Sequence, residues 1–340
     1  MKEKKKTVAI ITIFDNLNNG TYLQAYALSL IIEKLGYQVI FVDYCRIFNS
    51  LKYRLTNTVG NPLKAIYRAL MYEKRKQKLQ SIIRKNFHTT RSYIGYENLK
   101  KNLPKADIYL TGSDQVWNTM HNRGIDKAFY WGCIDSNKHT LISYAASIGL
   151  EDFANKDKAE IYSLLKRYSA ISVREENAIK ILKNMGLNAS MVLDPTLLLN
   201  KNEWINNIIK NSHKNYQPYI LIYSVETAKQ DPLIEIVTKH ISQKLGLKVK
   251  EMCFYKATRK NYVNEFHENP TPQDFISLMA NASYIIACSF HGTAFAINFN
   301  KPFVSVIPEK YSSRAISLLK ELDLQEHFIS KVSEINVSIR

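Results

Sequence analysis

The amino-acid sequence predicts an α/β protein of two Rossmann-like, doubly wound domains that face a cleft. The chain has 340 residues, and a typical domain has about 100–200. Its 46% hydrophobic and 23% charged residues are typical of globular proteins and exclude a mainly disordered chain. Short apolar runs alternate with longer amphipathic segments, and this pattern starts again in the second half of the chain. Such alternation predicts two parallel sheets with helices on both faces.

The first half of the chain contains a series of strand patterns separated by helix patterns. The strands are expected at Val8–Ile13, Gln38–Asp43, Asp107–Leu110, Leu141–Ala145 and Ala170–Val173. Helices are expected over residues 20–35, from Asn61-Pro62 onward, and over 174–184. Gly36 and Gly186 mark two of the helix ends, where a left-handed residue is favoured. We therefore expect an N-terminal Rossmann-like domain over residues 1–200.

The pattern restarts after a polar stretch that begins at Asp194-Pro195-Thr196 and that we interpret as a hinge. Strands are expected at Pro218–Tyr223, Leu247–Met252, Tyr284–Cys288 and Pro302–Val306. Helices are expected over residues 231–245, 271–280, 291–299 and 312–322. These elements predict a C-terminal Rossmann-like domain over residues 215–325, followed by a tail over 326–340.

The positive charge is concentrated in one helical insertion at about residues 51–101. The whole chain has 47 Lys and Arg against 30 Asp and Glu, a formal charge of +17. The insertion alone holds 13 basic and 2 acidic residues, which is 13 − 2 = +11. A solvated helix face and a surface near anionic lipid or a lipid-linked pyrophosphate both explain this charge. Nucleic acid is not favoured as a partner, because no nucleic-acid-binding motif accompanies the basic residues.

The termini, cysteines and histidines narrow the class of protein further. The apolar run after the basic N-terminus is interrupted by Asp15-Asn16 without a small-residue cleavage site, so it predicts a strand and not a secretory signal. The four cysteines are far apart, which argues against a disulfide scaffold or a zinc ribbon. The seven histidines other than His291 show no paired spacing, so we expect no metal site. No GxGxxG spacing supports a dinucleotide, and we expect no cofactor. We expect a cytoplasmic protein, peripheral at the inner face of the cell membrane.

In doubly wound sheets, ligands bind beyond the carboxyl ends of the strands, so the turns after strands are the candidate sites. The first turn contains Asp15, Asn16, Asn19 and Gly20 just before a helix. Its amides and carboxylate suit the hydroxyls of a sugar, and we expect these four residues to bind an acceptor. Ordinary turn chemistry is the alternative, since Asn, Asp and Gly favour turns in any case.

Two further turns follow strands of the first half. Ser113, Asp114 and Gln115 come directly after Asp107–Leu110, and Asp114 is a candidate catalytic base, with Ser113 and Gln115 binding the acceptor. A helix N-cap is the alternative role for Ser113 or Asp114. Arg174 comes at a strand end and suits a carboxylate or phosphate of a donor, or else a local ion pair with a neighbouring Glu.

The fourth turn lies between an apolar strand and a helix in the second half. Ser289, Gly292 and Thr293 surround His291 there, where a helix N-terminus favours an anionic donor. A histidine titrates near neutral pH, so His291 is the candidate catalytic acid. A buried structural histidine is the alternative.

These turns, in this order, resemble the polysaccharide pyruvyl transferase family. The similar segments are residues 15–28, Gly112–Asn118, Tyr144–Gly149, Ser172–Glu175, Leu193–Thr196 and Ser289–Thr293. The resemblance implies a GT-B-like fold and transfer of pyruvate from phosphoenolpyruvate to two hydroxyls of a sugar, which forms a cyclic ketal. The sugar would belong to a surface polysaccharide (exopolysaccharide) or its lipid-linked precursor.

The resemblance also implies that Arg174 and His291 bind phosphoenolpyruvate. Several family members carry Arg-x-His where this chain has Ser289-Phe290-His291, so one donor-binding cation is replaced here. Lys301 and Arg314 are the two candidates for its replacement. Two alternatives remain open at this level: a GT-B glycosyltransferase that uses a nucleotide sugar, and a polyanion-binding protein without enzymatic activity.

Overall fold

The computed structural model describes residues 5–14, 18–56, 62–209, 217–224, 232–253, 260–307 and 309–335. The chain divides into two compact units, and each is described by itself. The first unit comprises Met1–Leu17 and Gln24–Pro195, and the second comprises Asn18–Leu23 and Thr196–Arg340. The start of the first helix therefore belongs to the second unit.

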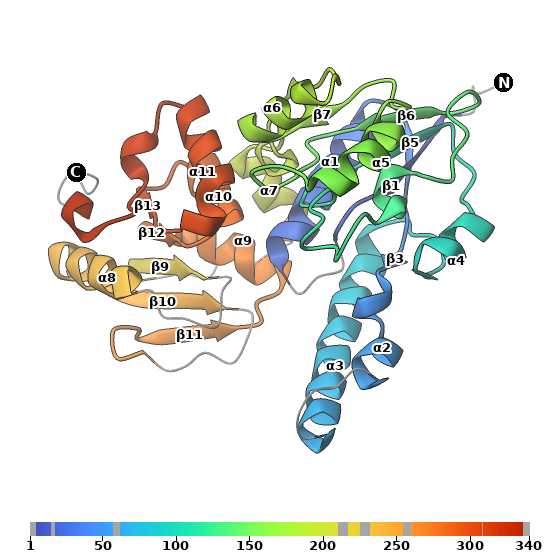
Figure 1. The fold of residues 1–340 in the computed structure, drawn as a ribbon. Helices are drawn as coiled ribbons and strands as arrows, with labels where there is room; N and C mark the ends of the chain where they lie inside the picture. The colour runs from blue at the N-terminus through green and yellow to red at the C-terminus, as the bar shows by residue number, and fades with distance from the viewer. Residues whose placement is uncertain are drawn as a thin grey trace. The chain divides into compact units, whose positions relative to one another are not determined.

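A parallel sheet of four strands forms the centre of the first unit (Figure 1). Its order is β2 (Gln38–Phe41), β1 (Thr7–Ile11), β5 (Ile108–Thr111) and β6 (Thr140–Ser143). Two short parallel pairs accompany it: β3 (Tyr44–Cys45) with β4 (Tyr93–Ile94), and β7 (Ser172–Val173) with β8 (Ser190–Met191). The α-helices are α1 (Asn19–Lys34), α2 (Leu51–Thr56), α3 (Pro62–Asn86), α4 (Tyr96–Lys101), α5 (Asn155–Leu165) and α6 (Glu176–Asn184).

A parallel sheet of five strands forms the centre of the second unit (Figure 1). Its order is β11 (Glu265–Glu268), β10 (Lys248–Cys253), β9 (Tyr219–Tyr223), β12 (Tyr284–Ala287) and β13 (Phe303–Ser305). The helices are α7 (Lys201–Ile208), α8 (Pro232–Leu245), α9 (Pro272–Asn281), α10 (Phe290–Asn298) and α11 (Glu309–Glu321). Short 3-10 helices cover Ile47–Asn49, Lys127–Tyr130, Pro195–Leu197, Gln325–His327 and Val332–Glu334.

Each sheet is apolar where helices cover it. Every residue of β9 and of β12 is buried, which explains why these strands appear in the sequence as continuous apolar runs without alternation. In the first unit the core is rich in aromatic rings, and the buried Trp117 stacks on Tyr130 at 5.8 Å between ring centroids. The fold class predicted from the sequence, α/β with two Rossmann-like parallel sheets, is confirmed.

Strand order locates the place where each sheet can bind a ligand. In the first sheet the connections reverse direction between β1 and β5, and in the second between β9 and β12. The loops after two such neighbouring strands diverge to opposite faces and leave a crevice at the carboxyl edge. The residues after β5 and after β12, which the sequence analysis gives as candidate sites, therefore lie beside these crevices.

Several elements differ from the sequence prediction, among them the short strands β3, β4 and β8 and the helices α2 and α4, which were not predicted. The edge strand β11 reads Glu-Phe-His-Glu and lacks the apolar residues that mark a buried strand, so it was missed. Helix α5 was also missed. The boundary between the two units follows Pro195, inside the predicted hinge. The rest of that stretch is not a plain linker, because α7 lies within it and the fully buried Trp204 packs on Phe295 at 5.2 Å between centroids. Residues 210–216 lie outside the described part of the chain.

Candidate active site

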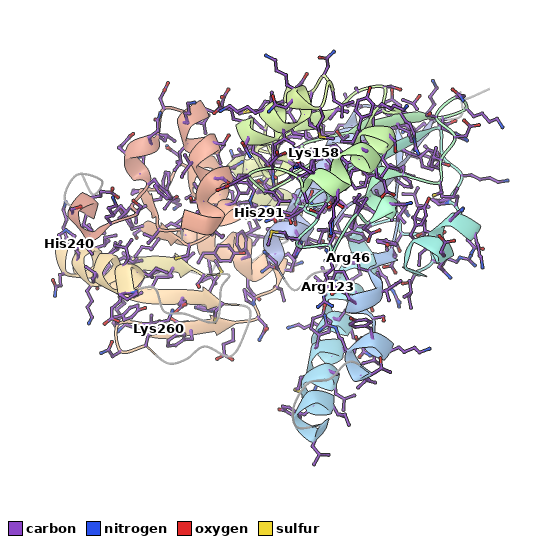
Figure 2. The ribbon with its side chains drawn as sticks, in the orientation of Figure 1. Arg46, Arg123, Lys158, His240, Lys260 and His291 are labelled. Atoms are coloured by element: carbon purple, nitrogen blue, oxygen red, sulfur yellow. The ribbon has the colours of Figure 1, made fainter. Side chains whose placement is uncertain are left out.

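His291 lies at the first turn of α10, immediately beyond the carboxyl end of β12 (Figure 2). The residue is buried, with 5% of its surface exposed. Its position next to the point where the sheet reverses is the place where doubly wound sheets bind ligands. The first turn of a helix carries N–H groups without helical partners and favours negative charge. His291 is thus a titratable group placed beside an anion-binding helix start.

Gly20 lies against the ring of His291 within the second unit. A Cβ atom added at Gly20 would overlap the imidazole atoms Cγ and Nδ1. Glycine is therefore required at this position for steric reasons and not because of its backbone angles. The close approach also brings the start of α1 to the start of α10, so the N-terminal turns of two helices meet around one imidazole.

Asn18 and Asn19 fix the start of α1 in this arrangement. The Asn18 side-chain oxygen accepts from the Gly20 backbone N–H at 2.9 Å and from the Tyr223 hydroxyl at 3.2 Å. The Asn19 amide donates to the carbonyl of Pro270 at 2.9 Å. Burial raises the pKa of Tyr223 well above its usual range, so its hydroxyl stays protonated and donates. Tyr223 ends β9, so both strands at the reversal point contribute to the site.

Ser289, Gly292 and Thr293 complete the start of α10. The Ser289 hydroxyl caps the helix by accepting from the Gly292 N–H at 3.1 Å. The Thr293 hydroxyl lies 2.6 Å from that of Ser305, at the end of β13, and donates to the Ser289 carbonyl at 3.2 Å. A Cβ at Gly292 would come within 2.8 Å of a Tyr223 ring carbon. In the structure these three residues hold the helix start in place.

Lys301 and Arg314, the two candidates for the cation that replaces the Arg of Arg-x-His, lie at different ends of the second sheet. Lys301 precedes β13 and donates to the carbonyl of Ala282, which precedes β12, at 2.8 Å. Because β12 and β13 are parallel, Lys301 lies at their amino ends and His291 at the carboxyl end. Arg314 lies on α11, beyond the carboxyl end of β13, and its guanidinium carbon is 5.8 Å from the centroid of the Phe290 ring. Of these two candidates, Arg314 therefore lies beside the His291 turn and Lys301 lies at the opposite end of the strands.

A second polar cluster lies at the carboxyl edge of the first unit, and Arg174 is at its centre. The Arg174 side chain is fully buried and its Nη1 donates to Asp194 at 2.6 Å and to Ser113 at 3.1 Å. Its Nη2 lies 3.4 Å from an Asp114 oxygen, and its Nε lies 3.8 Å from a Glu175 oxygen. The Ser113 hydroxyl in turn donates to Asp194 at 2.8 Å.

The charges of this cluster do not suit an anion. Burial alone would lower the pKa of Arg174, but Asp194, Asp114 and Glu175 outweigh it and raise that pKa, so the guanidinium stays charged. Three carboxylates against one guanidinium give a formal charge of −2 when all four are ionised. The local ion pair that the sequence left open as an alternative is present for Arg174, and this guanidinium positions carboxylates of its own unit.

Asp114 and Glu175 are held in different ways. Asp114 has a left-handed backbone (φ 80°), a conformation that is uncommon for residues other than glycine and that tends to occur at functional sites. One tenth of its side chain is exposed, more than for Arg174, Asp194 or Glu175, so it is the most exposed carboxylate of the cluster. One Glu175 oxygen accepts from the Ser147 hydroxyl and from the N–H groups of Ile148 and Gly149, at 2.8–3.0 Å.

The structure brings the predicted site residues together in two groups. Ser113, Asp114, Gln115 and Arg174 belong to the first unit, and Ser289, His291, Gly292 and Thr293 to the second. Asn19 and Gly20 were expected on the acceptor side, but they belong to the second unit with His291, because the start of α1 packs there. Asp15 and Asn16 lie outside the described residues. Among the described residues no group of three or more His, Cys, Asp or Glu side chains could hold a metal ion.

The sequence did not identify Asp194 or Tyr223 as members of these groups, and it indicated Glu175 only as the neighbouring Glu of an alternative ion pair with Arg174. Asp194 was treated as part of a hinge, although Asp-Pro directly follows a strand-like run. Tyr223 ends a predicted strand, and a search of every strand end would have found it. Glu175 offered no signal beyond its place next to Arg174.

The fold is similar to that of known GT-B enzymes. UDP-GlcNAc 2-epimerase from Methanocaldococcus jannaschii superposes with a TM-score of 0.52 at 11% identity, over 99% of this chain and 92% of that chain. UDP-GlcNAc 2-epimerase from Neisseria meningitidis, bound to UDP-GlcNAc, gives a TM-score of 0.48 at 11% identity, over 99% and 89%. At this identity the similarity defines the fold alone, and the fold is GT-B-like.

A comparison of the sequence with models of protein families identifies the family of this chain. The sequence model of the polysaccharide pyruvyl transferase family matches residues 18–310, which is most of the chain. The chain belongs to the polysaccharide pyruvyl transferase family and is a transferase of polysaccharide biosynthesis. No curated protein matches this chain in sequence.

Proposed function

We propose that the protein transfers pyruvate from phosphoenolpyruvate to two hydroxyls of a sugar and so forms a cyclic ketal. The observation that carries the proposal is the position of His291, buried at the start of α10 and packed against Gly20 at the start of α1. A proton donor beside two helix N-termini suits a small substrate that carries two anionic groups and accepts a proton. Phosphoenolpyruvate has both properties.

His291 acts as the general acid in this proposal. It transfers a proton to the methylene carbon of phosphoenolpyruvate, which becomes the methyl group and leaves positive charge on the adjacent carbon. A sugar hydroxyl adds to that carbon and loses its proton. The C–O bond to phosphate then breaks, and phosphate leaves with the bonding electron pair. The second hydroxyl adds to the same carbon and loses its proton, which closes the ketal. General acid catalysis of this kind contributes about 10²–10⁴-fold to a rate.

The donor is held by the second unit. The N-terminal turn of α10, with Ser289, Gly292 and Thr293, supplies positive potential for the phosphate. In the Arg-x-His pattern the donor-binding cation stands two residues before the histidine. Arg314 supplies this cation here, since its guanidinium carbon lies 5.8 Å from the centroid of the Phe290 ring, next to His291. Asn19 and Gly20 serve the donor side through the close packing of α1 on His291.

The acceptor is bound by the first unit. Asp114 is the base or orienting group for a sugar hydroxyl, because it is the more exposed carboxylate of the cluster, and Gln115 follows it. Ser113 and Arg174 act as positioning residues, since both are buried and bonded to Asp194. The net negative charge of the cluster suits a neutral sugar better than the anionic donor. Arg174 therefore positions the carboxylates of the acceptor site and does not bind the donor.

The acceptor is the precursor of a surface polysaccharide, carried on a lipid, and the enzyme is peripheral at the inner face of the membrane. This part of the proposal is supported by the family and by the +11 charge of residues 51–101. Among the helices of the described residues, none is long and apolar enough to cross a bilayer.

Calorimetry with Arg314→Gln tests the donor site. We expect wild-type protein to bind phosphoenolpyruvate and the variant to bind it about 10–150-fold more weakly, since a hydrogen bond to a charged group contributes about 1.5–3 kcal/mol. Lys301→Gln is the matched control, because it removes the same charge at the opposite end of the sheet and should leave binding unchanged. Binding of a uridine or guanosine diphosphate sugar in place of phosphoenolpyruvate would favour a glycosyltransferase.

A further inference from the structure

Helix α3 presents one continuous face to solvent. Its outward residues recur at three- and four-residue spacing, which places them on a single side of an α-helix. We call this side the outer face; it consists of Leu63, Ile66, Tyr67, Leu70, Lys74, Gln77, Lys78, Ser81, Arg84 and Lys85, all exposed. The opposite side holds the buried residues Ala69, Leu79 and Ile83. The 25 residues of α3 span about 37 Å.

The outer face has two different halves. The first half is apolar, and its Leu63 and Tyr67 have 76% and 65% of their surface exposed. The second half carries Lys74, Lys78, Arg84 and Lys85. None of the ten residues is acidic. A contiguous, exposed row of large apolar side chains marks an interaction site, because single exposed residues are common but rows are not.

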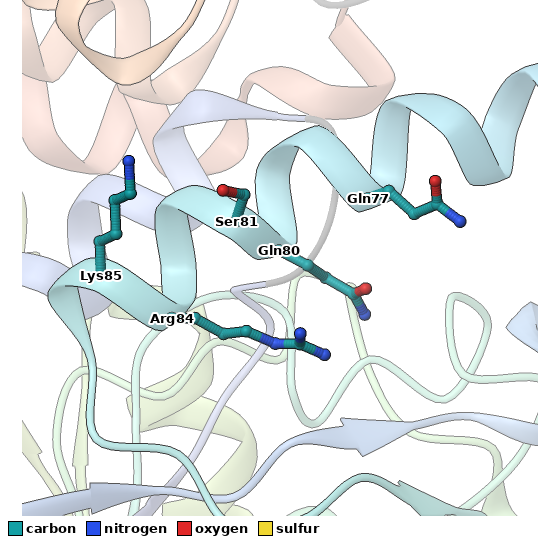
Figure 3. Close-up of a pocket in the computed structure, with 5 residues that line it drawn as sticks. All are labelled: Gln77, Gln80, Ser81, Arg84 and Lys85. Carbon is teal, nitrogen blue, oxygen red and sulfur yellow. The ribbon is translucent and has the colours of Figure 1, made fainter.

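The second half also borders an open hollow of about 560 Å³, lined by Gln77, Gln80, Ser81, Arg84 and Lys85 (Figure 3). All five side chains project from α3 in the figure, and each can donate a hydrogen bond. Amide, hydroxyl, guanidinium and ammonium donors together suit phosphate oxygens.

The base of the helix pair α2–α3 is fixed to the first unit. Arg123 donates to the Tyr53 hydroxyl at 3.3 Å and its guanidinium carbon lies 4.6 Å from the centroid of the Phe48 ring (Figure 2). The guanidinium carbon of Arg54, on α2, lies 3.8 Å from the centroid of the Tyr72 ring on α3. Figure 1 shows α2 and α3 side by side, extending away from the four-stranded sheet of this unit. The outer face is therefore presented on a fixed support.

We propose that the outer face of α3 docks on an anionic lipid bilayer, with α3 lying along the membrane surface; this inference rests on the peripheral membrane location proposed above and assigns it to one surface. The apolar half enters the boundary between head groups and acyl chains, and the basic half binds lipid phosphates. A bilayer with anionic lipid matches both halves at once. A nucleic acid would match only the basic half, and a second copy of the chain would bring two basic surfaces together.

Co-sedimentation of the full chain with vesicles tests this proposal. We expect wild-type protein at low salt to bind vesicles of phosphatidylcholine with phosphatidylglycerol, and to bind phosphatidylcholine alone much more weakly. Leu63→Ser with Tyr67→Ser should weaken binding at least about tenfold, and Lys74→Gln with Lys78→Gln about 25-fold. All four residues are exposed, so these variants should unfold at the wild-type temperature.

Matched control variants change the same residue types elsewhere in the first unit. Leu35→Ser with Tyr162→Ser, and Lys105→Gln with Lys183→Gln, alter exposed residues outside α3 and should bind vesicles as the wild type does. A Tyr67→Trp variant adds a depth probe, because Trp117, Trp131 and Trp204 are fully buried. We expect brominated lipid to quench its additional fluorescence, and not that of Tyr162→Trp.

Four results would overturn the proposal. The first is that wild-type protein does not bind anionic vesicles at low salt, and the second is that the outer-face and control variants bind vesicles equally. The third is that wild-type protein self-associates and the Leu63→Ser, Tyr67→Ser variant does not. The fourth is that wild-type protein binds single-stranded RNA more tightly than vesicles. The assays contain no substrate, so they are independent of the proposed reaction.

Discussion

At the scale of single residues, His291 is the side chain on which the proposed chemistry depends. Its imidazole is buried at a helix start, with Gly20 on one side and the Phe290 ring 5.3 Å away between centroids. A histidine packed in this way has a fixed orientation, which a proton donor needs more than flexibility. Two predictions follow from the contacts of this one side chain.

His291→Asn should reduce ketal formation by about 10²–10⁴-fold, because the amide keeps polar atoms in place but cannot transfer the proton. The midpoint of thermal unfolding should change little. His240→Asn is the control, since His240 lies on α8 of the same unit and away from His291 (Figure 2). A variant at residue 291 with near wild-type turnover would remove His291 from the mechanism.

Gly20→Ala should destabilise the protein by about 1–3 kcal/mol, the usual cost of inserting a methyl group where there is no room, and should reduce activity with it. Because the added methyl group would overlap the imidazole, the effect should depend on His291. In urea unfolding, Gly20→Ala should cost much less stability in a His291→Ala background than in the wild type. Equal costs in both backgrounds would mean that the two residues do not share this contact.

At the scale of elements, the sites lie at strand ends that parallel sheets bring to one edge. Tyr223 ends β9, Thr293 touches Ser305 at the end of β13, and Asp114 and Arg174 follow β5 and β7. Each strand is short and apolar, and the polar residues follow directly after its buried part. The buried strand therefore supports the polar cluster at its end. The clusters are thus held by the sheets and not by long loops.

Removal of Arg174 tests the cluster of the first unit. Arg174→Met should lower the free energy of unfolding by about 3–5 kcal/mol, because buried carboxylates lose their only cation among the four charged side chains. Asp194→Asn added to it should recover part of the loss, since it removes one of the uncompensated charges. A cost below about 1 kcal/mol in denaturant unfolding would indicate a solvated ion pair, contrary to its burial.

An element could be predicted from the sequence where apolar residues mark the part of it that is buried. The apolar runs of β9 and β12 and the glycine after α1 placed those elements within one or two residues. The polar edge strand β11 and helix α7 could not be found in that way. The choice between Lys301 and Arg314 needed the direction of β12 and β13, because only the strand ends separate the two cations.

At the scale of the whole molecule, the excess positive charge and the two candidate sites lie in different parts of the chain. Residues 51–101 carry +11 of the total +17, so the other residues together carry +6. The two parallel sheets supply the two clusters, while the excess charge lies on the helical insertion and outside both. Catalysis and membrane docking are therefore expected to respond to separate substitutions.

Saturating phosphoenolpyruvate should stabilise the protein against thermal unfolding. A ligand at 100 times its dissociation constant contributes about 2.7 kcal/mol to the folded state. We expect this shift to be smaller in Arg314→Gln at the same ligand concentration and unchanged in Lys301→Gln. Stabilisation by a nucleotide sugar and none by phosphoenolpyruvate would contradict the donor assignment.

The most direct measurement is a product assay with the purified chain. The protein is incubated with phosphoenolpyruvate and candidate lipid-linked oligosaccharides, and both released phosphate and the mass of the sugar are followed. The account predicts one phosphate released for each pyruvate ketal gained by the sugar, and a loss of both in His291→Asn. Phosphate release without a gain in sugar mass, or sugar transfer from a nucleotide donor, would contradict it.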